Sequence, residues 1–336
     1  MTAEQTIPKR NWQFDFLKGV SCIFVIFLHC PFPGTFGDLI IYACRFPVPI
    51  FFMITGYYCY HKDKSWIKKK SIGILKMLVL TELFYGIWNC LRSFLSDSSS
   101  VNEYLKSLDV VAHPLRILLF GSVFNGTLWY LYAAFWTYCV LYILLHKDKI
   151  NASWYFLIPV LLCLQIFGRF YWQNHYDIEA GVWLFRSALL FGVPLTLLGH
   201  LFAHWSEQIQ SRMNWLKSIS VIILGGLLIV AEYLIAGQYM DFHLSTVFVS
   251  AGLFLLAMTY PYKETKLLRL ISFIGRKLSM WIYLSHIFFS NVLSLLTEKY
   301  SVISGPLFTW TRPILVCLCS ALFAYLASLL QTKKKI

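Results

Sequence analysis

Residues 14–30 read FDFLKGVSCIFVIFLHC, a run of apolar side chains that also contains Asp15, Lys18 and His29. A helix needs about 20 mainly apolar residues to cross the hydrocarbon core of a membrane, and this run is close to that length. Ionisable side chains are costly at that depth and usually face a cavity or another polar group. The run therefore predicts a membrane helix with one polar, functional face.

The composition of the chain extends this interpretation. Of the 336 residues, 58% are hydrophobic and 13% are charged, whereas soluble domains are about half apolar and about a quarter charged. The formal net charge is +13. Lys and Arg lie mainly in short loops between apolar runs, which is typical of membrane topology and not of nucleic-acid binding. We predict an all-α integral membrane protein without a nucleic-acid partner.

The apolar runs predict about ten transmembrane helices in a single membrane domain over residues 1–336. Most of the 29 Lys and Arg residues fall on the side of the N-terminus when the runs alternate across the membrane. Both termini are therefore expected in the cytoplasm, with the protein in the plasma membrane. The nine cysteines form no C-x-x-C pair, and we expect no metal site. The expected spans are residues 14–32, 39–60, 71–95, 127–146, 153–171, 183–203, 217–236, 243–260, 279–296 and 307–330.

Helix geometry relates the polar residues of the first span. The step from Lys18 to His29 is three turns plus about 20°, so both side chains share one face, about 16 Å apart along the axis. Asp15 lies one turn before Lys18, close enough to pair with it. This face is expected to line a passage. Two alternatives stay open: an ion pair that only anchors the helix, and a packing hydrogen bond for His29.

Four segments, taken in order, resemble a known family. The first span carries D-x-x-K and then, after ten residues, His29. RFPVPIFFMITGYY (45–58) is similar to the family pattern VPxFFxxSGY, and GTLWYLYAAF (126–135) is similar to HLWYLPA. ISFIGRKLSMWIYLSHIFF (271–289) is similar to GxxSxxIYLxH. Together they resemble membrane acyltransferase family 3.

The resemblance implies a reaction and roles for three residues. Members of this family move an acyl group, usually acetyl, from coenzyme A in the cytoplasm to a sugar hydroxyl at the outer face. His29 matches the general base, a role that suits an imidazole because its pKa lies near working pH. Lys18 matches the residue that helps to hold the acyl donor, and Asp15 would orient it. Acyl-coenzyme A would be a co-substrate, with no permanently bound cofactor.

The sequence departs from the family pattern in two ways. The family often has an R-x-x-R pair after the second span, whereas this chain offers Lys69, Lys70 and Lys76 for the donor phosphates. Lysine is a poorer bidentate partner for phosphate than arginine. Thr55 and Thr127 also replace the usual Ser and His.

Polar residues of the other spans are expected to line a substrate pocket. The predicted topology places several of them at the depth of His29, which indicates an outward pocket for a polar or anionic ligand. Trp129 would stack on a sugar ring. The alternatives are arginines that snorkel to the lipid headgroups and a tryptophan in an interfacial aromatic belt. The predicted pocket residues are Arg45, Glu82, Trp129, Arg186, Glu232, His286 and Arg312.

A rival function stays open at this level. PVPIFFMITGYY, WIKKK and FRSALLFGVP resemble most closely the membrane half of the vancomycin-resistance serine racemases, and we expect no racemase half. That resemblance implies a membrane domain for L-serine uptake. A non-catalytic subunit of surface-polymer assembly is a further alternative. The expected partners are membrane lipid, the acyl-coenzyme A donor and a glycan or other hydroxyl-bearing acceptor; the oligomeric state is left open.

Overall fold

The computed structural model describes residues 11–96, 104, 114–121, 123–146, 149–176, 178–236, 242–260, 265–299 and 305–333. The chain divides into two compact units: unit 1 comprises Met1–Phe51 and Ser206–Ile336, and unit 2 comprises Phe52–Trp205. The expected all-α fold is confirmed. Within the described ranges, the strands are the two-residue β1 (Leu145–His146) and β2 (Lys149–Ile150), which pair antiparallel.

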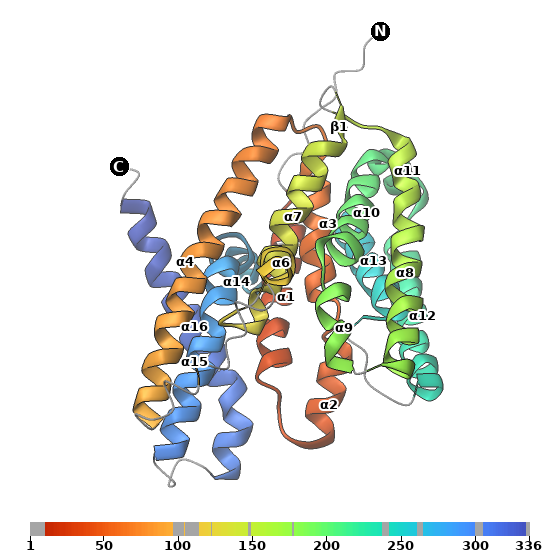
Figure 1. Ribbon diagram of the computed structural model, residues 1–336. Helices are drawn as coiled ribbons and strands as arrows, with labels where there is room; N and C mark the ends of the chain where they lie inside the picture. Colours follow the sequence, from red (N-terminus) through yellow and green to blue (C-terminus); the bar gives the residue numbers. More distant parts are fainter. Residues whose placement is uncertain are drawn as a thin grey trace. The chain divides into compact units, whose positions relative to one another are not determined.

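Unit 1 is a bundle around the N-terminal helix α1 (Trp12–His29). This helix packs against α13, α14, α15, α16 and the π-helix η4, so both ends of the chain contribute to one core (Figure 1). Ile26, Ile282 and Val316 are buried where α1, α15 and α16 meet. The other elements of the unit are α2 (Gly34–Ala43), α11 (Ser206–Arg212), α12 (Trp215–Ala236), α13 (Leu244–Thr259), α14 (Lys266–Phe273), η4 (Ile274–Leu278), α15 (Ser279–Lys299) and α16 (Pro306–Lys333).

Small residues let the backbone of α1 approach α14 and η4 closely. A Cβ added at Gly19 would collide with the carbonyl oxygen of Ile271, and one added at Gly275 would collide with that of Asp15. Such small-residue crossings are a common way of packing helices in membranes, where lipid offers no hydrophobic drive for helix association. The crossing fixes α1 along its axis and therefore the place of the residue at its far end, His29.

Unit 2 is built around α7 (Trp129–Leu144), which packs against α4, the π-helix η3 and α10. α3 (Pro47–Cys59) runs from unit 1 into unit 2. Its backbone meets that of α10 closely, because Gly56 faces the carbonyl oxygen of Thr196. The other elements are α4 (Lys64–Ser96), α6 (Pro114–Phe120), η1 (Gly126–Leu128), η2 (Ala152–Phe156), α8 (Leu157–His175), α9 (Ile178–Phe185), η3 (Ala188–Gly192) and α10 (Val193–His204).

The helices account for the predicted spans, although spans 39–60 and 183–203 are each interrupted by a break, after Ala43 and after Phe185. In the described part of the chain, eight helices are long and apolar enough to cross a membrane, or nine if the pair Ala188–His204 and Ser206–Arg212, bent by 72°, counts as one span. The remaining expected span corresponds to α13, which has 16 residues and reaches only about 24 Å. The protein is thus a multi-pass membrane protein by the length and composition of its helices.

The helix of the third span begins before the predicted span, and a cap explains why. The third span was expected from residue 71, but α4 begins at Lys64. The Asp63 carboxylate accepts hydrogen bonds from the backbone N–H of Trp66 at 3.0 Å and the Ser65 hydroxyl at 2.6 Å. These bonds satisfy the first turn, so the helix starts before the apolar run does. The lysines expected in a loop therefore lie on a helix.

Candidate active site

The histidine of the first span meets a second histidine inside unit 1. His29 is the last residue of α1 and is exposed. Its imidazole ring lies 5.3 Å from that of His286 on α15, centroid to centroid, with the planes inclined by 40°. Residues of the first and last family-like segments thus come together at the end of α1. One imidazole of this pair is therefore exposed and the other is buried.

His286 has a defined tautomer. The side chain is 1% exposed, and its Nδ1 lies 2.6 Å from the carbonyl oxygen of Tyr283. A carbonyl oxygen only accepts, so Nδ1 carries a proton and Nε2 of the neutral ring presents a lone pair. Nε2 is buried and has no hydrogen-bond partner among the described residues. The site therefore holds a buried nitrogen base beside an accessible imidazole.

A guanidinium is fixed one turn further along α15. Nη2 of Arg312 donates to the hydroxyl of Ser294 at 2.6 Å, and to the hydroxyl and carbonyl oxygens of Ser290 at 3.2 and 3.3 Å. His286, Ser290 and Ser294 follow one another at four-residue intervals and so share one helix face. The Cys30 thiol contacts Ser290 and lies near Arg312. Arg312 thus lies at the same end of α1 as His29.

The other two residues predicted as catalytic lie nearer the start of α1. Asp15 is 4% exposed and belongs to the first turn of the helix, where a carboxylate is favoured by the helix dipole. Lys18 follows one turn later and is half-buried. The continuous α1 helix keeps Lys18 and His29 on one face, about 16 Å apart along the axis. The predicted separation therefore holds in the folded chain.

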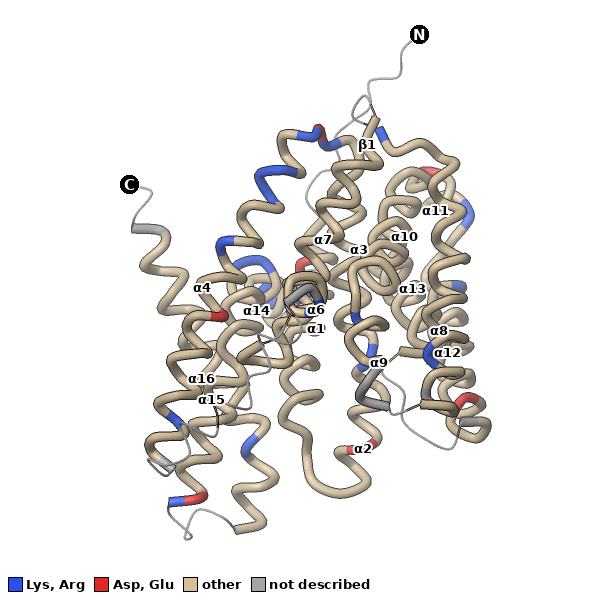
Figure 2. Tube along the Cα trace, in the orientation of Figure 1, with Lys and Arg blue, Asp and Glu red and all other residues tan. Residues whose placement is uncertain are grey.

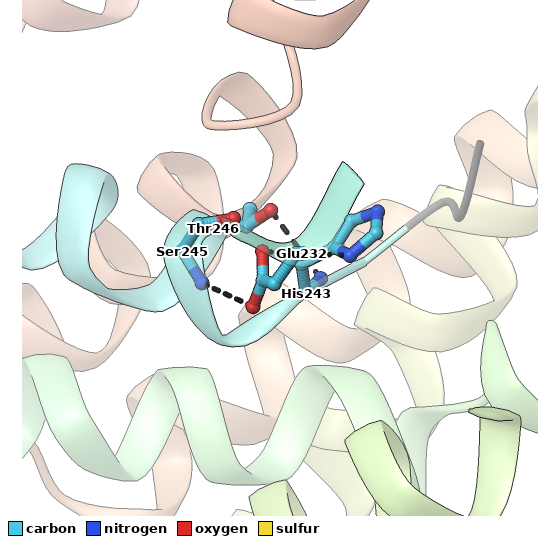
Figure 3. A network of polar contacts seen from close by, with 4 residues as sticks. All are labelled: Glu232, His243, Ser245 and Thr246. Carbon is cyan, nitrogen blue, oxygen red and sulfur yellow. Dashed lines mark hydrogen bonds and ion pairs between the residues drawn. The ribbon is translucent and has the colours of Figure 1, made fainter. Parts of the chain in front are cut away.

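Glu232 makes its contacts at the corner between α12 and α13 (Figure 3). One carboxylate oxygen accepts from the backbone N–H of Ser245 at 3.1 Å, and the other lies 3.5 Å from Nδ1 of His243. His243 and Thr246 form the capping box of α13. The carboxylate thus holds the start of α13. Arg45, also predicted for the pocket, is half-buried in the turn between α2 and α3.

In unit 2, Glu82 holds the segment that leads into α7. Its two carboxylate oxygens accept from the backbone N–H of Phe124 and from the Tyr132 hydroxyl, both at 3.2 Å. The hydroxyl of Thr127, which stands where the family pattern has His, donates to the Asn125 side chain at 2.9 Å. The polar groups of this segment therefore position the start of α7.

Trp129 lies at the start of α7, beside the second predicted pocket residue of unit 2. The Arg186 guanidinium lies over the Trp129 ring at 5.7 Å, and the ring of Phe191 meets the same indole edge-on at 5.3 Å. Both Trp129 and Arg186 are half-buried. Stacking on a cation fixes the orientation of the indole, so these two predicted residues form a pair.

The predicted phosphate-binding lysines are exposed on the first turns of α4. Figure 2 shows several basic positions along this helix. Lys69 and Lys76 are two turns apart, so they share one face at a separation of about 10 Å along the axis. Lys70 lies over the Trp66 ring at 5.2 Å. The pKa of Asp63 at the helix start is lowered by the hydrogen bonds from Ser65 and Trp66. The helical arrangement leaves Lys69 and Lys76 available to an anion.

Sequence reasoning missed the serines that hold Arg312. Serines are common in membrane helices, and neither Ser290 nor Ser294 belongs to a segment pattern that assigns them a role. The available signal was the four-residue repeat of polar side chains after His286 in an apolar helix. Recognising that the repeat binds a cation needs the partner helix, α16, which the sequence of α15 does not specify.

An accessible imidazole, a buried imidazole with a free lone pair and a fixed guanidinium form a set of groups suited to group transfer by general-base catalysis. Comparison with known protein families gives the class directly. The family model for the acyltransferase 3 domain, described as an acyltransferase domain, matches residues 11–330. The chain therefore belongs to this family and is an acyltransferase, which confirms the resemblance seen in its motifs. No curated protein and no solved structure matched the chain.

Proposed function

We propose that the protein transfers an acyl group, most simply acetyl, from acyl-coenzyme A on the cytoplasmic side to a hydroxyl of a cell-surface glycan or similar exported acceptor. Residues 1–336 form a single membrane domain in the plasma membrane, with both termini in the cytoplasm. The observation that carries this proposal is the exposed imidazole of His29 beside the buried His286. A general base must be reachable by the hydroxyl that it deprotonates.

The donor enters at the opposite end of α1. Asp15 orients Lys18, and Lys18 helps to hold the acyl donor. The phosphates of coenzyme A are attracted by the exposed Lys69, Lys70 and Lys76. The distance of about 16 Å between Lys18 and His29 suits an extended pantetheine arm. The acyl carbon then lies near His29 while the nucleotide stays at the inner surface.

The acceptor meets the donor at His29. Trp129, stacked with Arg186, offers a flat apolar surface for a sugar ring. Binding of the acceptor also depends on Arg45, Glu82 and Glu232. The two acids act indirectly, because each holds the start of a helix. His29 takes the proton of the hydroxyl as the oxygen attacks the thioester carbonyl.

The test follows labelled acetyl groups. Native membranes containing the protein are incubated with acetyl-coenzyme A labelled in the acetyl group, and label is measured in cell-envelope glycan. His29→Ala should lower incorporation by about 10²–10⁴-fold, the usual contribution of a general base. His146→Ala, which changes an exposed histidine of β1, is the matched control and should leave incorporation unchanged.

A second measurement concerns the donor alone. The purified protein should bind acetyl-coenzyme A in detergent, and Lys18→Ala should weaken that binding. Absence of binding and transfer by the unaltered protein, together with uptake of labelled L-serine into vesicles that contain it, would replace the acyltransfer proposal with the carrier function.

A further inference from the structure

We propose that Arg312 stabilises the oxyanion that forms on the acyl carbonyl oxygen during transfer, and that Ser290 and Ser294 hold its guanidinium for that purpose. The inference rests on the proposed acyl transfer and adds a further catalytic group to it. Three features of Arg312 support it: the hydrogen bonds that hold the guanidinium, the absence of a carboxylate counter-ion among the described residues, and the position of Arg312 relative to the histidine pair.

Among the described residues, the guanidinium is held through Nη2. This nitrogen donates three hydrogen bonds, which end on Ser290 and Ser294. An arginine has five N–H donors in a rigid plane, so fixing one nitrogen fixes the direction of the rest. Nε is buried and has no acceptor among the described residues. A buried N–H of a cation without an acceptor is unfavourable unless a ligand provides one.

The charge of Arg312 has no counter-ion in the part of the chain that the structure describes. No carboxylate of the described residues forms an ion pair with it, since its contacts are with serine oxygens. A charge within a membrane helix is expensive, and such residues usually pair with one another or serve a ligand. The guanidinium of Arg312 is directed to Ser290 and Ser294 of α15. The missing negative charge is therefore one that a substrate brings or develops.

The position of the guanidinium fits charge that develops beside His29. Ser290 and Ser294, which hold the guanidinium, lie one and two turns beyond His286 on α15, rises of about 6 and 12 Å. Cys30, the residue after His29, contacts Ser290 and lies near Arg312. Two connections therefore place the fixed cation near the imidazole pair. One runs along α15 from His286, and the other runs through Cys30 at the end of α1. A preorganised cation close to a general base is the arrangement that stabilises a tetrahedral intermediate.

The reaction balances with these groups. The hydroxyl oxygen of the acceptor attacks the thioester carbon and forms a C–O bond, while its proton passes to the imidazole of His29. The π electrons of the carbonyl move to its oxygen, which becomes the oxyanion next to Arg312. The carbonyl re-forms as the C–S bond breaks, and the thiolate of coenzyme A takes the proton back from the imidazolium. The products are an ester and free coenzyme A.

A permanent anionic group on the acceptor would also suit an arginine, and the two roles differ in kinetics. Stabilisation of an oxyanion acts only in the transition state, so its loss lowers kcat and leaves KM and ground-state binding unchanged. Recognition of a fixed anion acts in the ground state, so its loss raises KM for the acceptor. The way Nη2 is clamped favours the first role, because a preorganised group avoids reorganisation during the reaction.

The experiment uses the full chain in native membranes, with release of free coenzyme A from acetyl-coenzyme A as the readout. Arg312→Gln should lower kcat by about 10²–10³-fold, the usual effect of removing one oxyanion donor, with KM unchanged. Ser294→Ala keeps the cation but removes its shortest hydrogen bond, and should lower kcat by about tenfold, the equivalent of one hydrogen bond to a charged group. Arg269→Gln, at an exposed arginine of α14, is the matched control.

The outcomes separate the possible failures. Binding of acetyl-coenzyme A to purified Arg312→Gln should match that of the unaltered protein. Unchanged kcat in both variants, or a raised KM with unchanged kcat, would overturn the oxyanion role while acyl transfer itself stands. If Arg312→Gln does not fold, Ser294→Ala decides the question. No coenzyme A release by the unaltered protein would instead refute the proposed function.

Discussion

The buried imidazole of His286 lies against the exposed imidazole of His29, with ring centroids 5.3 Å apart. Nδ1 of His286 donates its proton to the Tyr283 carbonyl oxygen. In the neutral ring the other nitrogen, Nε2, is therefore an acceptor. A neutral acceptor next to a general base can orient that base and stabilise the imidazolium formed during turnover. His286 is therefore the first residue to substitute in a test of this relationship.

We expect His286→Gln to lower the rate of acyl transfer by about 10²-fold without weakening the binding of acetyl-coenzyme A. Glutamine keeps a polar side chain at the buried position but lacks the ring. His175→Gln is the control, because His175 also binds a carbonyl oxygen of its own helix, that of Tyr171, but is exposed. An unaltered rate in His286→Gln would leave His29 acting alone.

The close crossing of α1 with η4 gives a stability prediction. Gly275→Ala should destabilise the protein by about 1–3 kcal/mol, because the new methyl group overpacks against the backbone of α1. Gly226→Ala on α12, where nothing lies near the new methyl group, should be neutral or stabilising. Thermal unfolding in detergent measures both. Equal melting temperatures for the two variants would show that the helices do not meet as described.

The role of Glu82 is open to a test by hydrogen exchange. Glu82→Ala removes the acceptor for the Phe124 N–H and the Tyr132 hydroxyl, each worth about 1.5–3 kcal/mol for a charged partner. Amide exchange around Phe124 should therefore become faster, and transfer should fall because the start of α7 carries Trp129. Glu207→Ala, at an exposed residue of α11, should change neither. Protection retained near Phe124 would contradict the assignment.

The start of α4 should show a defined dependence on pH. Hydrogen bonds from Ser65 and Trp66 lower the pKa of Asp63 below its usual range. A carboxyl group with a lowered folded-state pKa stabilises the protein above its unfolded pKa, and that contribution disappears as pH falls through the folded pKa. Asp63→Ala should therefore lower the melting temperature at pH 7 and have less effect at strongly acidic pH. A difference that persists undiminished in acid would assign the effect to something other than the ionised cap.

The sequence alone determined the membrane fold, the helices and the family. Hydrophobic length is a local property, so the apolar runs are helical in the structure, and the face shared by Lys18 and His29 follows from helix geometry. The boundary at Lys64 was missed because a single capping carboxylate, Asp63, outweighs the onset of the apolar run. The depth of a side chain could also be inferred, but depth does not specify a partner.

Only the tertiary structure decided which polar residues meet. Arg312 and Glu232 were both predicted for the substrate pocket. Ser290 and Ser294 hold the first near the histidine pair, while the second holds the start of α13. The physical reason is that membrane spans present many polar side chains at similar depth. Their pairing depends on which helices pack together, and that is set by contacts such as Gly19 and Gly275 with the facing backbones.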